Sequence, residues 1–398
     1  MTLEGKRILL GMTGGVAAFK SCELARRLGR VGADVRVVMT EAATRFVTPV
    51  TMQALTGQTA WTDLWDARVP DNMGHIELSR DRDLIVVAPA TADFMAKAAN
   101  GLADDLLSSI VLARRCPLML APAMNVEMWQ NPATQRNVRT LHGDGVLFAG
   151  PVPGGQACGE TGMGRMLEAA EIAEEIEACF QDRILAGRRV LVTAGPTEEP
   201  IDPVRVITNA SSGKMGYAVA RAAREAGAEV TLVSGPTSLP GPAGVERIDV
   251  RSAAQMFDAV KKHAGACDVF IAVAAVADYR VKAPSAQKIK KGASTPRTLE
   301  LVENPDILAH VAAMKKPPFC VGFAAESEDL ERNARVKRAK KGIPLLAANL
   351  AQSAIGADEN AITLFDDAGA HALGRGPKLE QARKLVAHVA GMLAKRKR

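Results

Sequence analysis

The chain has 398 residues, 47% of them hydrophobic and 4% aromatic, and a formal net charge of +6. This length is enough for two or three ordinary domains. No apolar run approaches the ~18–20 residues of a membrane span, and the N-terminus has no signal-peptide pattern. The six cysteines form no CxxC pair and no zinc-type cluster with histidine. We expect a cytoplasmic protein with reduced thiols and no membrane association.

Two basic runs hold much of the excess positive charge, "RVKRAKKG" at 335–342 and "AKRKR" at 394–398. A nucleic-acid surface of this kind would interleave aromatic residues with the basic ones, and neither run does so. A solvated helix face and a frayed terminus account for both runs. We therefore expect no nucleic-acid partner, whereas small anions such as phosphates remain plausible ligands.

The N-terminal residues 6–40 predict a strand, a glycine loop, a helix, a turn and a second strand. Residues 188–236 repeat this plan: "LGRVGADVRVVMT" in the first copy matches "AREAGAEVTLVSG" in the second. A β-α-β unit of this type joins parallel strands through a right-handed helical crossover. The repeat therefore predicts two α/β domains.

The domain boundary is expected in "CFQDRILAGRR" (179–189), where a helical pattern ends and a new strand begins. We predict an α/β fold with mainly parallel sheets in two Rossmann-like, three-layer domains. Residues 1–186 are expected to be flavodoxin-like and residues 187–398 ribokinase/Rossmann-like. Ligands of such open sheets bind beyond the carboxyl ends of the strands.

The loop "GMTGGVAA" (11–18) separates the first predicted strand from its helix, where backbone N–H groups can bind an anion. It is neither GxGxxG nor a P-loop. Thr91 and Asn125 follow two later predicted strands, and capping of a turn is the better explanation of each taken separately. Two such strand ends together with a glycine loop favour a ligand pocket. His75 stands alone in "NMGHIEL", and a lone histidine is more often structural than catalytic.

The segment "QACGETGMGRM" (156–166) places Cys158 among glycines, which give the backbone freedom for a mobile or sharply turned segment. On the residues alone the thiol could be a nucleophile, a metal ligand, a proton donor or without function. A nucleophile needs an activating base beside it, and none is evident locally.

The first half resembles the flavin-dependent cysteine decarboxylases that act on 4′-phosphopantothenoylcysteine. The resemblance covers about residues 5–180 and rests on "GMTGGVAAFK", "MGHIEL", "APATADF", "PAMNVEMW" and "ACGETGMGRM" in this order. It implies FMN as cofactor, His75 as active-site base, Asn125 as the ligand of the substrate carboxylate and Cys158 as proton donor on a flap. The residues that it implies for FMN binding are Thr13, Gly14, Gly15, Thr40, Ala90 and Thr91.

The expected chemistry explains these residue types. Direct loss of CO₂ from the cysteine carboxylate would leave an unstabilised carbanion. Oxidation of the thiol end to a thioaldehyde by the flavin makes the β-carbon an electron sink. CO₂ then leaves to give an ene-thiol. Return of the hydride requires a proton from an acid.

The second half carries a long polar loop before a predicted helix, with "SSGKMG" at 211–216. The Walker pattern fails at Thr208 and Met215, but Ser212, Gly213 and Lys214 at a helix N-terminus predict an oxyanion site. N-capping by Ser212 is the competing interpretation.

Further charged residues stand near the predicted strand and helix ends. Asp278 ends a strand, where an acid can contact a metal–phosphate unit or cap a helix. Pro305 and Asp306 open a helix, with proline at N1 as the plain explanation. The remaining candidates are lysines: Lys288, Lys290 and Lys291 in one run, and Lys337 and Lys341 at i and i+4 of a helix. The set suits a nucleoside triphosphate with Mg²⁺.

The order "DPVR…TNASSGKMG", "AAVADYR", "KIKK", "NPDI", "VGFAAE" over about residues 188–390 resembles phosphopantothenate–cysteine ligase. The resemblance implies that CTP activates the carboxylate of 4′-phosphopantothenate as an acyl-cytidylate, which the amine of cysteine then attacks. Asn209, Arg205 and Lys288 would be catalytic, and Asp278 would also face Mg²⁺. The residues implied for CTP binding are Ser212, Gly213, Lys214, Ala272, Val273, Ala274, Asp278, Lys288, Pro305, Asp306, Ile307, Leu308, Phe323, Lys337 and Lys341.

Both halves on one chain resemble the bacterial bifunctional enzymes of coenzyme A synthesis, which implies a homo-oligomer, a dodecamer of trimers and dimers. Two alternatives remain at this point. A flavin-binding regulatory protein would have lost catalytic residues, whereas His75, Asn125 and Cys158 are all present. A nucleic-acid binder would show salt-dependent elution from DNA.

Overall fold

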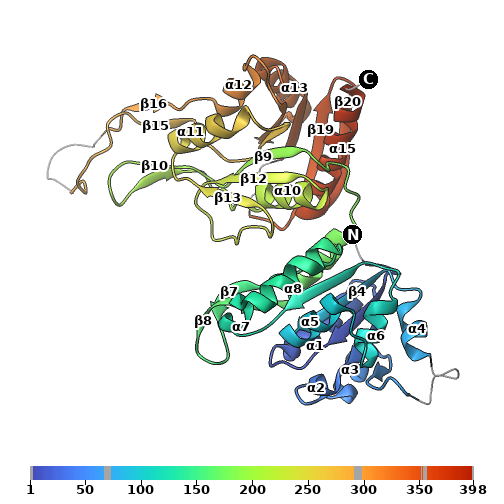
Figure 1. The fold of residues 1–398 in the computed structure, drawn as a ribbon. Coiled ribbons are helices and arrows are strands. Elements are labelled where there is room, and N and C mark those ends of the chain that lie inside the picture. Colours follow the sequence, from blue (N-terminus) through green and yellow to red (C-terminus); the bar gives the residue numbers. More distant parts are fainter. Residues whose placement is uncertain (1–2, 67–72, 291–297, 351, 353–355, 397–398) are drawn as a thin grey trace. The chain divides into compact units, whose positions relative to one another are not determined.

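The computed structural model describes residues 3–66, 73–290, 298–350, 352 and 356–396 (Figure 1). The chain divides into two compact units, Met1–Phe180 and Gln181–Arg398. Lys291 of the predicted lysine run and the last two residues of the basic tail lie outside the described residues.

Unit 1 alternates strands with helices along the chain and ends in a hairpin and a helix. Its elements are β1 (Arg7–Met12), α1 (Ala18–Arg30), β2 (Asp34–Met39), α2 (Glu41–Thr44), α3 (Pro49–Thr56), β3 (Ala60–Trp61), α4 (Gly74–Ser79), β4 (Leu84–Ala90), α5 (Ala92–Asn100), α6 (Leu106–Ala113), β5 (Leu118–Pro122), α7 (Val126–Gln130), α8 (Pro132–Gly143), β6 (Leu147–Phe148), β7 (Val152–Gly155), β8 (Thr161–Arg165) and α9 (Ala169–Cys179).

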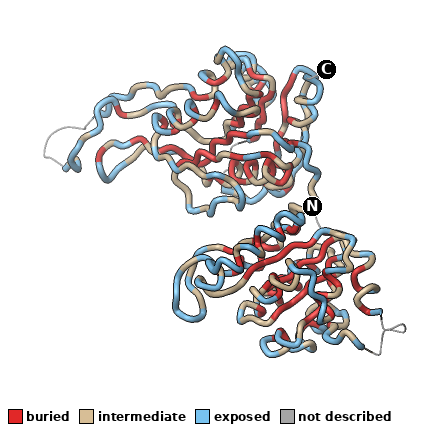
Figure 2. The backbone as a smooth tube through the Cα atoms, in the orientation of Figure 1, coloured by how far each residue is buried: buried red, intermediate tan, exposed pale blue. Residues whose placement is uncertain are grey.

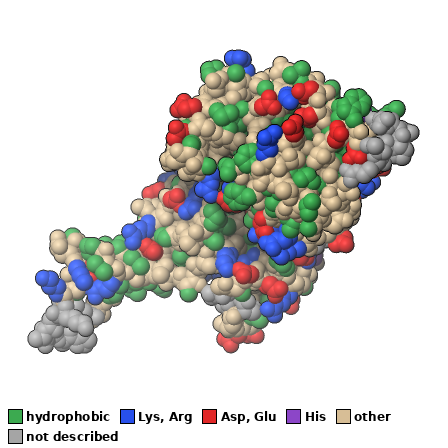
Figure 3. All heavy atoms as spheres, turned by 90° about the horizontal axis from the view of Figure 1, so that it is seen from below, with side chains coloured by type: hydrophobic (Ala, Val, Ile, Leu, Met, Phe, Trp, Pro, Cys, Tyr) green, Lys and Arg blue, Asp and Glu red, His purple; other side chains and the backbone are tan. Residues whose placement is uncertain are grey.

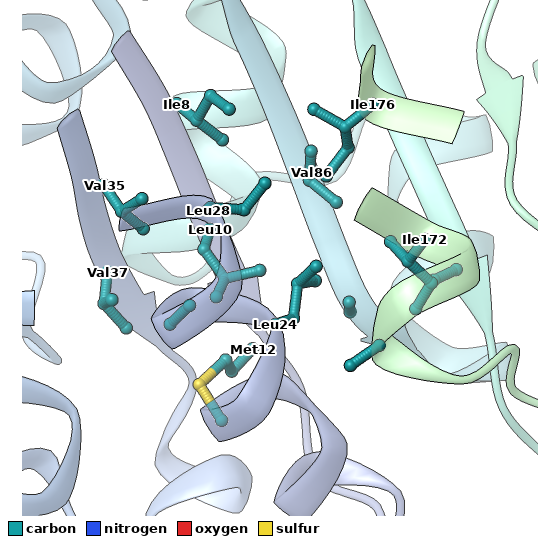
Figure 4. Packing of buried hydrophobic residues seen from close by; sticks show 14 of the residues in the cluster. Ile8, Leu10, Met12, Leu24, Leu28, Val35, Val37, Val86, Ile172 and Ile176 are labelled. Carbon is teal, nitrogen blue, oxygen red and sulfur yellow. The ribbon is translucent and has the colours of Figure 1, made fainter. Parts of the chain in front are cut away.

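The sheet of unit 1 has the order β3-β2-β1-β4-β5-β6, and every pair in it is parallel. Because successive side chains of a strand point to opposite faces, Leu10 of β1 packs toward α1 and α9, while Leu9 packs toward α5 and α6. Figure 4 shows the first face, where Leu24 and Leu28 of α1 meet Ile172 of α9. The buried sheet lies between two helical layers, as the buried strands in Figure 2 also show.

Unit 2 begins with the same plan and closes with a β-hairpin and a long helix. Its elements are β9 (Arg189–Ala194), β10 (Glu198–Pro200), β11 (Val206–Thr208), α10 (Lys214–Glu225), β12 (Glu229–Ser234), β13 (Glu246–Asp249), α11 (Ala253–Ala264), β14 (Val269–Ala272), β15 (Tyr279–Val281), β16 (Leu301–Glu303), α12 (Ile307–Ala312), β17 (Phe319–Glu326), α13 (Leu330–Lys341), β18 (Leu345–Leu350), β19 (Glu359–Asp366), β20 (Gly369–Pro377) and α15 (Lys378–Arg396).

The main sheet of unit 2 runs β13-β12-β9-β14-β17-β18-β19-β20. Its first six strands are parallel, and β19 and β20 are added antiparallel. Helices α10 and α15 cover one face, and α11, α12 and α13 cover the other. The predicted α/β fold with mainly parallel sheets is therefore confirmed, as is the repeated β-α-β plan at the start of each unit.

Two small antiparallel sheets, β10–β11 and β15–β16, form an arm that extends from the main sheet of unit 2 (Figure 1). Lys and Arg side chains gather toward the end of this arm in the space-filling view (Figure 3). Among the described residues, no helix combines the length and apolar character that crossing a membrane requires.

Candidate active sites

Polar side chains follow the strands of the first sheet at its carboxyl edge. Thr13, Thr40 and Thr91 come directly after β1, β2 and β4, and Asn125 follows β5. The buried Thr13 hydroxyl donates a hydrogen bond to the Pro89 carbonyl (2.7 Å) and accepts one from the Thr91 N–H (3.1 Å). Thr13 therefore fastens the loops after two neighbouring strands and fixes the shape of this edge.

Helix capping accounts for three of the predicted site residues. The hydroxyls of Thr40 and Thr91 each accept a backbone N–H at 3.3 Å and cap α2 and α5. Asn125 caps α7 through Oδ1, which accepts the Glu127 N–H at 2.8 Å. The capping interpretation of Thr91 and Asn125 is confirmed, and it leaves Nδ2 of Asn125 for other partners. The Ala90 side chain is fully buried.

The glycine loop before α1 has the features of an anion site. A side chain at Gly14 would collide with Ala42, because its Cβ would lie 2.4 Å from the Ala42 Cβ. Gly15 has space, with the nearest atoms 3.9 Å from its would-be Cβ. The helix N-terminus carries no side-chain cap and no acidic residue in its first turn. The N–H groups of Ala18 and Lys20 bond to backbone carbonyls, but the dipole of the helix still favours a phosphate beside Gly15.

Cys158 lies in the turn of the β7–β8 hairpin beside two polar side chains. Its Sγ is 3.5 Å from Asn125 Nδ2 and 3.6 Å from Glu160 Oε2. Asn125 Nδ2 also donates a hydrogen bond to the Glu160 carboxylate. The sequence indicated no base beside the thiol. The turn, however, brings Glu160, two positions later in the chain, next to Cys158. The exposed thiol therefore has both an amide and a carboxylate as neighbours.

The glycines of this hairpin are required mainly by space rather than by mobility. A Cβ at Gly162 would lie 2.5 Å from Val126 Cγ2, and one at Gly164 would lie 2.3 Å from the Met124 carbonyl oxygen. The Met124 N–H donates to the Gly164 carbonyl at 3.0 Å. The sequence predicts a mobile or sharply turned segment; the structure shows a hairpin packed against the loop that carries Asn125.

Gly164→Ala tests this packing. The substitution places a methyl group against the Met124 carbonyl at a φ of +133°, so the hairpin must move away from the loop. We expect a loss of decarboxylation of about 10²-fold, the cost of a small misplacement of catalytic groups, measured as turnover with bound flavin.

Gly155→Ala is the matched control on the same hairpin, because nothing lies within 4 Å of its would-be Cβ. It should retain near wild-type turnover. Equal activities of the two variants would contradict a packing role for Gly164.

A cavity of about 570 Å³ opens between the glycine loop, the Asn125 loop and the hairpin. Gly15, Asn125 and Cys158 line it, together with Lys20 and Arg165. The Lys20 ammonium donates to the Met166 carbonyl at 2.9 Å and pairs with Glu168 at 2.8 Å. Hydrogen bonds from Lys20 and then Arg165 hold the pKa of Glu168 below its usual value, although burial opposes this. The two cations at the edge of this cavity are therefore both paired with the Glu168 carboxylate, which lines it as well.

His75 is not brought to this cavity. It lies in α4, which packs on α6, and Figure 1 shows α4 and the β7–β8 hairpin at opposite edges of unit 1. Its Nδ1 is buried and has no hydrogen-bond partner among the described residues. A buried nitrogen without a hydrogen bond is energetically costly. Nδ1 of His75 therefore needs a partner other than the described residues of its own chain.

Two adjoining cavities, of about 490 and 400 Å³, lie at the carboxyl ends of β9, β14 and β17 in unit 2. Ala274, Asp278, Phe323 and Lys337 line both of them. Of the predicted residues, the larger cavity also contains Asn209, Ser212, Gly213, Lys214 and Val273, and the smaller contains Ala272, Pro305, Asp306, Ile307, Leu308 and Lys341.

The start of α10 forms the anion-binding end of the larger cavity. Gly213 occupies the N-cap with a φ of +77°, and no side chain caps the helix. Capping by Ser212 is therefore wrong, and its hydroxyl remains available to a ligand. A Cβ at Gly216 would lie 2.4 Å from the Ala194 Cβ, so this glycine lets the helix pack closely on β9. Lys214 pairs with Asp358 at 2.6 Å on the rim.

The smaller cavity is built around the start of α12. Asp306 caps this helix by accepting the Ala309 N–H at 3.0 Å, so the aspartate is the N-cap and Pro305 precedes it rather than occupying N1. Its other carboxylate oxygen accepts a hydrogen bond from Lys341 of α13. Burial would raise the pKa of Asp306, but the bonds from Lys341 and Ala309 hold it below its usual value.

Two predicted catalytic residues lie outside both cavities. The Arg205 guanidinium pairs with the buried Asp202 and donates to the Ile289 carbonyl at 2.9 Å. Hydrogen bonds from Arg205 and several backbone N–H groups hold the pKa of Asp202 far below its usual value, against the effect of burial. Arg205 therefore anchors the segment that carries Lys288, which is itself exposed on the arm.

Several site residues were missed by sequence reasoning. Glu160 beside Cys158 could have been found from its position in the same motif. Lys378, Asn349 and Asn360 reach the larger cavity from the C-terminal elements, where no motif pointed to them. Burial, together with the charge of Lys214, lowers the pKa of Lys378, although the Asp358 carboxylate opposes this.

Comparisons with known proteins agree with this division of the chain. The model of the "Flavoprotein" family matches residues 1–181, and that of the "DNA/pantothenate metabolism flavoprotein C-terminal domain" matches residues 185–393. The chain is 52% identical over 377 residues to the "Coenzyme A biosynthesis bifunctional protein CoaBC" of Vibrio cholerae, covering 94% of each chain. It is 49% identical over 372 residues to the protein of that name from Escherichia coli, covering 92% of each. A crystal structure of the C-terminal domain of a CoaBC protein matches 54% of this chain and 100% of its own, with 40% identity and a TM-score of 0.47.

Proposed function

The chain belongs to the CoaBC family of bifunctional coenzyme A biosynthesis proteins, and on this premise we propose how its two units work. The chain is a flavoprotein decarboxylase joined to a ligase, and it catalyses two consecutive steps of coenzyme A biosynthesis. Unit 2 ligates 4′-phosphopantothenate with cysteine. Unit 1 decarboxylates the resulting 4′-phosphopantothenoylcysteine to 4′-phosphopantetheine. The observation that carries this function is the match of both families along one chain.

We assign the two cavities of unit 2 to two substrates. The carboxylate of one substrate must attack the α-phosphate of the other, so their sites have to adjoin, and the cavities share Asp278, Phe323 and Lys337. The start of α10 suits the phosphate of 4′-phosphopantothenate, because it offers an uncapped helix end and the Ser212 hydroxyl. CTP then occupies the smaller cavity. This revises the expectation that Ser212, Gly213 and Lys214 bind CTP.

The residues shared by the two cavities stabilise the charge that develops during ligation. Lys337 stabilises negative charge as the acyl-cytidylate forms and pyrophosphate leaves. Asp278, an exposed carboxylate in this wall, suits Mg²⁺ bound to the triphosphate. The Asn209 amide donates to the Ala275 carbonyl at 3.0 Å, which fixes it beside the same wall. The amine of cysteine then displaces CMP.

Lys288 acts from the arm of a second copy in this proposal. It is exposed and lies outside both cavities of its own chain, while Arg205 holds its segment in place through the Ile289 carbonyl. A dimer of ligase units brings such an arm to a neighbouring cavity, where the ammonium group meets the transferring phosphate.

The residues of unit 1 fit FMN as the cofactor. The uncapped start of α1 and the open space at Gly15 suit its phosphate, and the 570 Å³ cavity continues from there to Cys158. When bound, FMN supplies the redox chemistry that makes the substrate carboxylate a good leaving group. Asn125 Nδ2 binds that carboxylate, and Cys158 delivers a proton to the ene-thiol carbon and regains one from solvent.

A complete decarboxylase site uses two copies of the chain. His75 and Cys158 lie at opposite edges of unit 1, so a reaction that needs both takes them from neighbouring copies. Association of this kind also supplies a partner for the unpaired Nδ1 of His75. Trimers of unit 1 joined through dimers of unit 2 give a dodecamer.

Complementation tests the shared site. His75→Asn and Cys158→Ser are expected to be inactive alone. In co-expressed mixtures about a quarter of the sites should combine both wild-type residues, so turnover should recover to about that fraction. No recovery in a mixed oligomer shown by mass spectrometry to contain both variants would place both residues in one chain's site.

The function itself is tested by the products of the purified, yellow protein. With 4′-phosphopantothenate, cysteine and CTP we expect CMP, pyrophosphate and 4′-phosphopantetheine by mass spectrometry. CMP formation should require 4′-phosphopantothenate and Mg²⁺, and ATP should not replace CTP. A yellow protein without turnover would instead favour a regulatory flavin-binding protein. We place the enzyme in the cytoplasm, with small molecules rather than nucleic acid as partners.

A further inference from the structure

Three possible metal ligands converge in unit 2 on the hairpin and helix that close its sheet. Asp366 ends β19, His371 lies on β20, and His388 lies on α15. The His371 Nε2 is 3.0 Å from Asp366 Oδ1, and the His388 Nε2 is 2.9 Å from Asp366 Oδ2. One ligand atom from each residue can be chosen so that all three lie within 4.8 Å of one another.

The hairpin register explains how these residues meet. His371 pairs with Leu364 across the β19–β20 ladder, and the tight turn brings Asp366 opposite Gly369. Helix α15 packs on both strands, which brings His388 over the same point. The two imidazole rings lie 4.9 Å apart, centroid to centroid. Three consecutive elements of the chain therefore direct their donor atoms to one place.

The carboxylate is held in a fixed orientation. Asp366 Oδ1 accepts the backbone N–H groups of Ala368 (2.8 Å) and Gly369 (3.1 Å). Its side chain is 6% exposed, whereas those of His371 and His388 are 37% and 23% exposed. Ordering of a ligating carboxylate by outer hydrogen bonds is typical of metal sites. The partly exposed imidazoles leave a path from solvent to the site.

We propose that Asp366, His371 and His388 bind one divalent transition-metal ion of the zinc type, apart from the Mg²⁺ used in ligation. Two imidazole nitrogens and a carboxylate oxygen are ligands that Zn²⁺ and Co²⁺ accept, with water in the fourth position. Bond lengths of about 2.0–2.2 Å put tetrahedral ligand atoms roughly 3.3–3.5 Å apart, so the present arrangement needs only small movements. Coordination through Nε2 uses the neutral imidazole with its proton on Nδ1, so bonds to the metal replace the two Nε2 contacts with Asp366.

The ion would fasten α15 to the β19–β20 hairpin. β20 is the edge strand of the main sheet, and α15 begins at Lys378, which lines the larger ligase cavity. A metal ion bound at His388 would therefore stabilise α15, whose first residue lines that cavity. Without metal, the same three residues form a hydrogen-bonded triad, and the experiment must separate these two states.

Co²⁺ is the probe, used with full-length protein stripped by chelator. The double variant His371→Gln, His388→Gln removes both imidazole ligands but keeps N–H donors for Asp366. His142→Gln, an exposed histidine of unit 1, is the matched control. We expect wild type and control to bind one more equivalent of Co²⁺ than the double variant, with tetrahedral visible absorption. Co²⁺ should also raise the melting temperature of these two proteins but not that of the double variant.

Equal Co²⁺ stoichiometry and equal melting shifts in all three proteins would overturn the proposal and leave the hydrogen-bonded triad. Asp366→Asn gives a second measurement, because it keeps the side chain's size but replaces one carboxylate oxygen with an amide donor. Loss of the extra equivalent in this variant supports the site. Retention of that equivalent, with the histidines intact, would also overturn it.

Discussion

Cys158→Ser is expected to separate loss of CO₂ from formation of the final product. The hydroxyl keeps the position of the thiol beside Asn125 and Glu160 but is a far weaker acid. CO₂ release should continue while the ene-thiol accumulates, and 4′-phosphopantetheine formation should fall by about 10²–10⁴-fold, the usual contribution of a general acid. Mass spectrometry of the products, with trapped CO₂, measures both steps.

Cys179→Ser is the control for this substitution. Its thiol donates to the Glu175 carbonyl within α9, and a serine hydroxyl can make the same bond, so both steps should proceed normally. The ligase reaction should be unchanged in both variants, because Cys158 lines only the cavity of unit 1. Loss of CO₂ release in Cys158→Ser with flavin still bound would show that the thiol acts before decarboxylation.

Lys337→Gln is expected to lower ligation by about 10²–10³-fold, as loss of a single group that stabilises transition-state charge does. Lys337 lines both cavities of unit 2. In the proposed assignment of substrates, its ammonium group stands where the carboxylate and the α-phosphate meet. Release of pyrophosphate from CTP in the presence of 4′-phosphopantothenate gives the rate of the affected step. Decarboxylation of supplied 4′-phosphopantothenoylcysteine should be unaffected.

Lys340→Gln provides the matched control on the same helix. Lys340 is exposed and lines neither cavity. Its substitution removes the same charge as Lys337→Gln, so the ligation rate of this variant should stay near that of wild type. A comparable loss in both variants would attribute the effect to the net charge of α13 rather than to the position of Lys337.

Much of the fold was predictable because its signals are local. The apolar runs, the glycine stops and the repeated β-α-β plan determine strands and helices through side-chain periodicity and backbone freedom, which act over a few residues. The same locality explains why the sequence places polar residues correctly at the ends of strands. Asn125 and Asp278 follow strands of parallel sheets, and the carboxyl ends of such strands meet at one edge.

The roles of individual residues depend on the conformation of each loop and on its packing contacts. Gly164 reads as a flexible residue, but it is required by the Met124 carbonyl that approaches it. Ser212 reads as a helix cap, yet Gly213 takes that place. Arg205 reads as a catalytic cation, while its guanidinium is paired with Asp202. The Gly164 outcome depends on a distant segment, whereas those of Ser212 and Arg205 depend on local loop conformation, which the sequence pattern does not specify.

The sequence by itself determined the α/β class of the fold, the family of each half and the position of most candidate residues at sheet edges. Only the tertiary structure decided which of these residues share a cavity. It brought Cys158 to Asn125 and Glu160, left His75 at the opposite edge of unit 1, and gathered Asp366 with His371 and His388. The reason is physical: periodicity specifies which face of an element is buried, whereas the partners across that face are set by how whole elements pack.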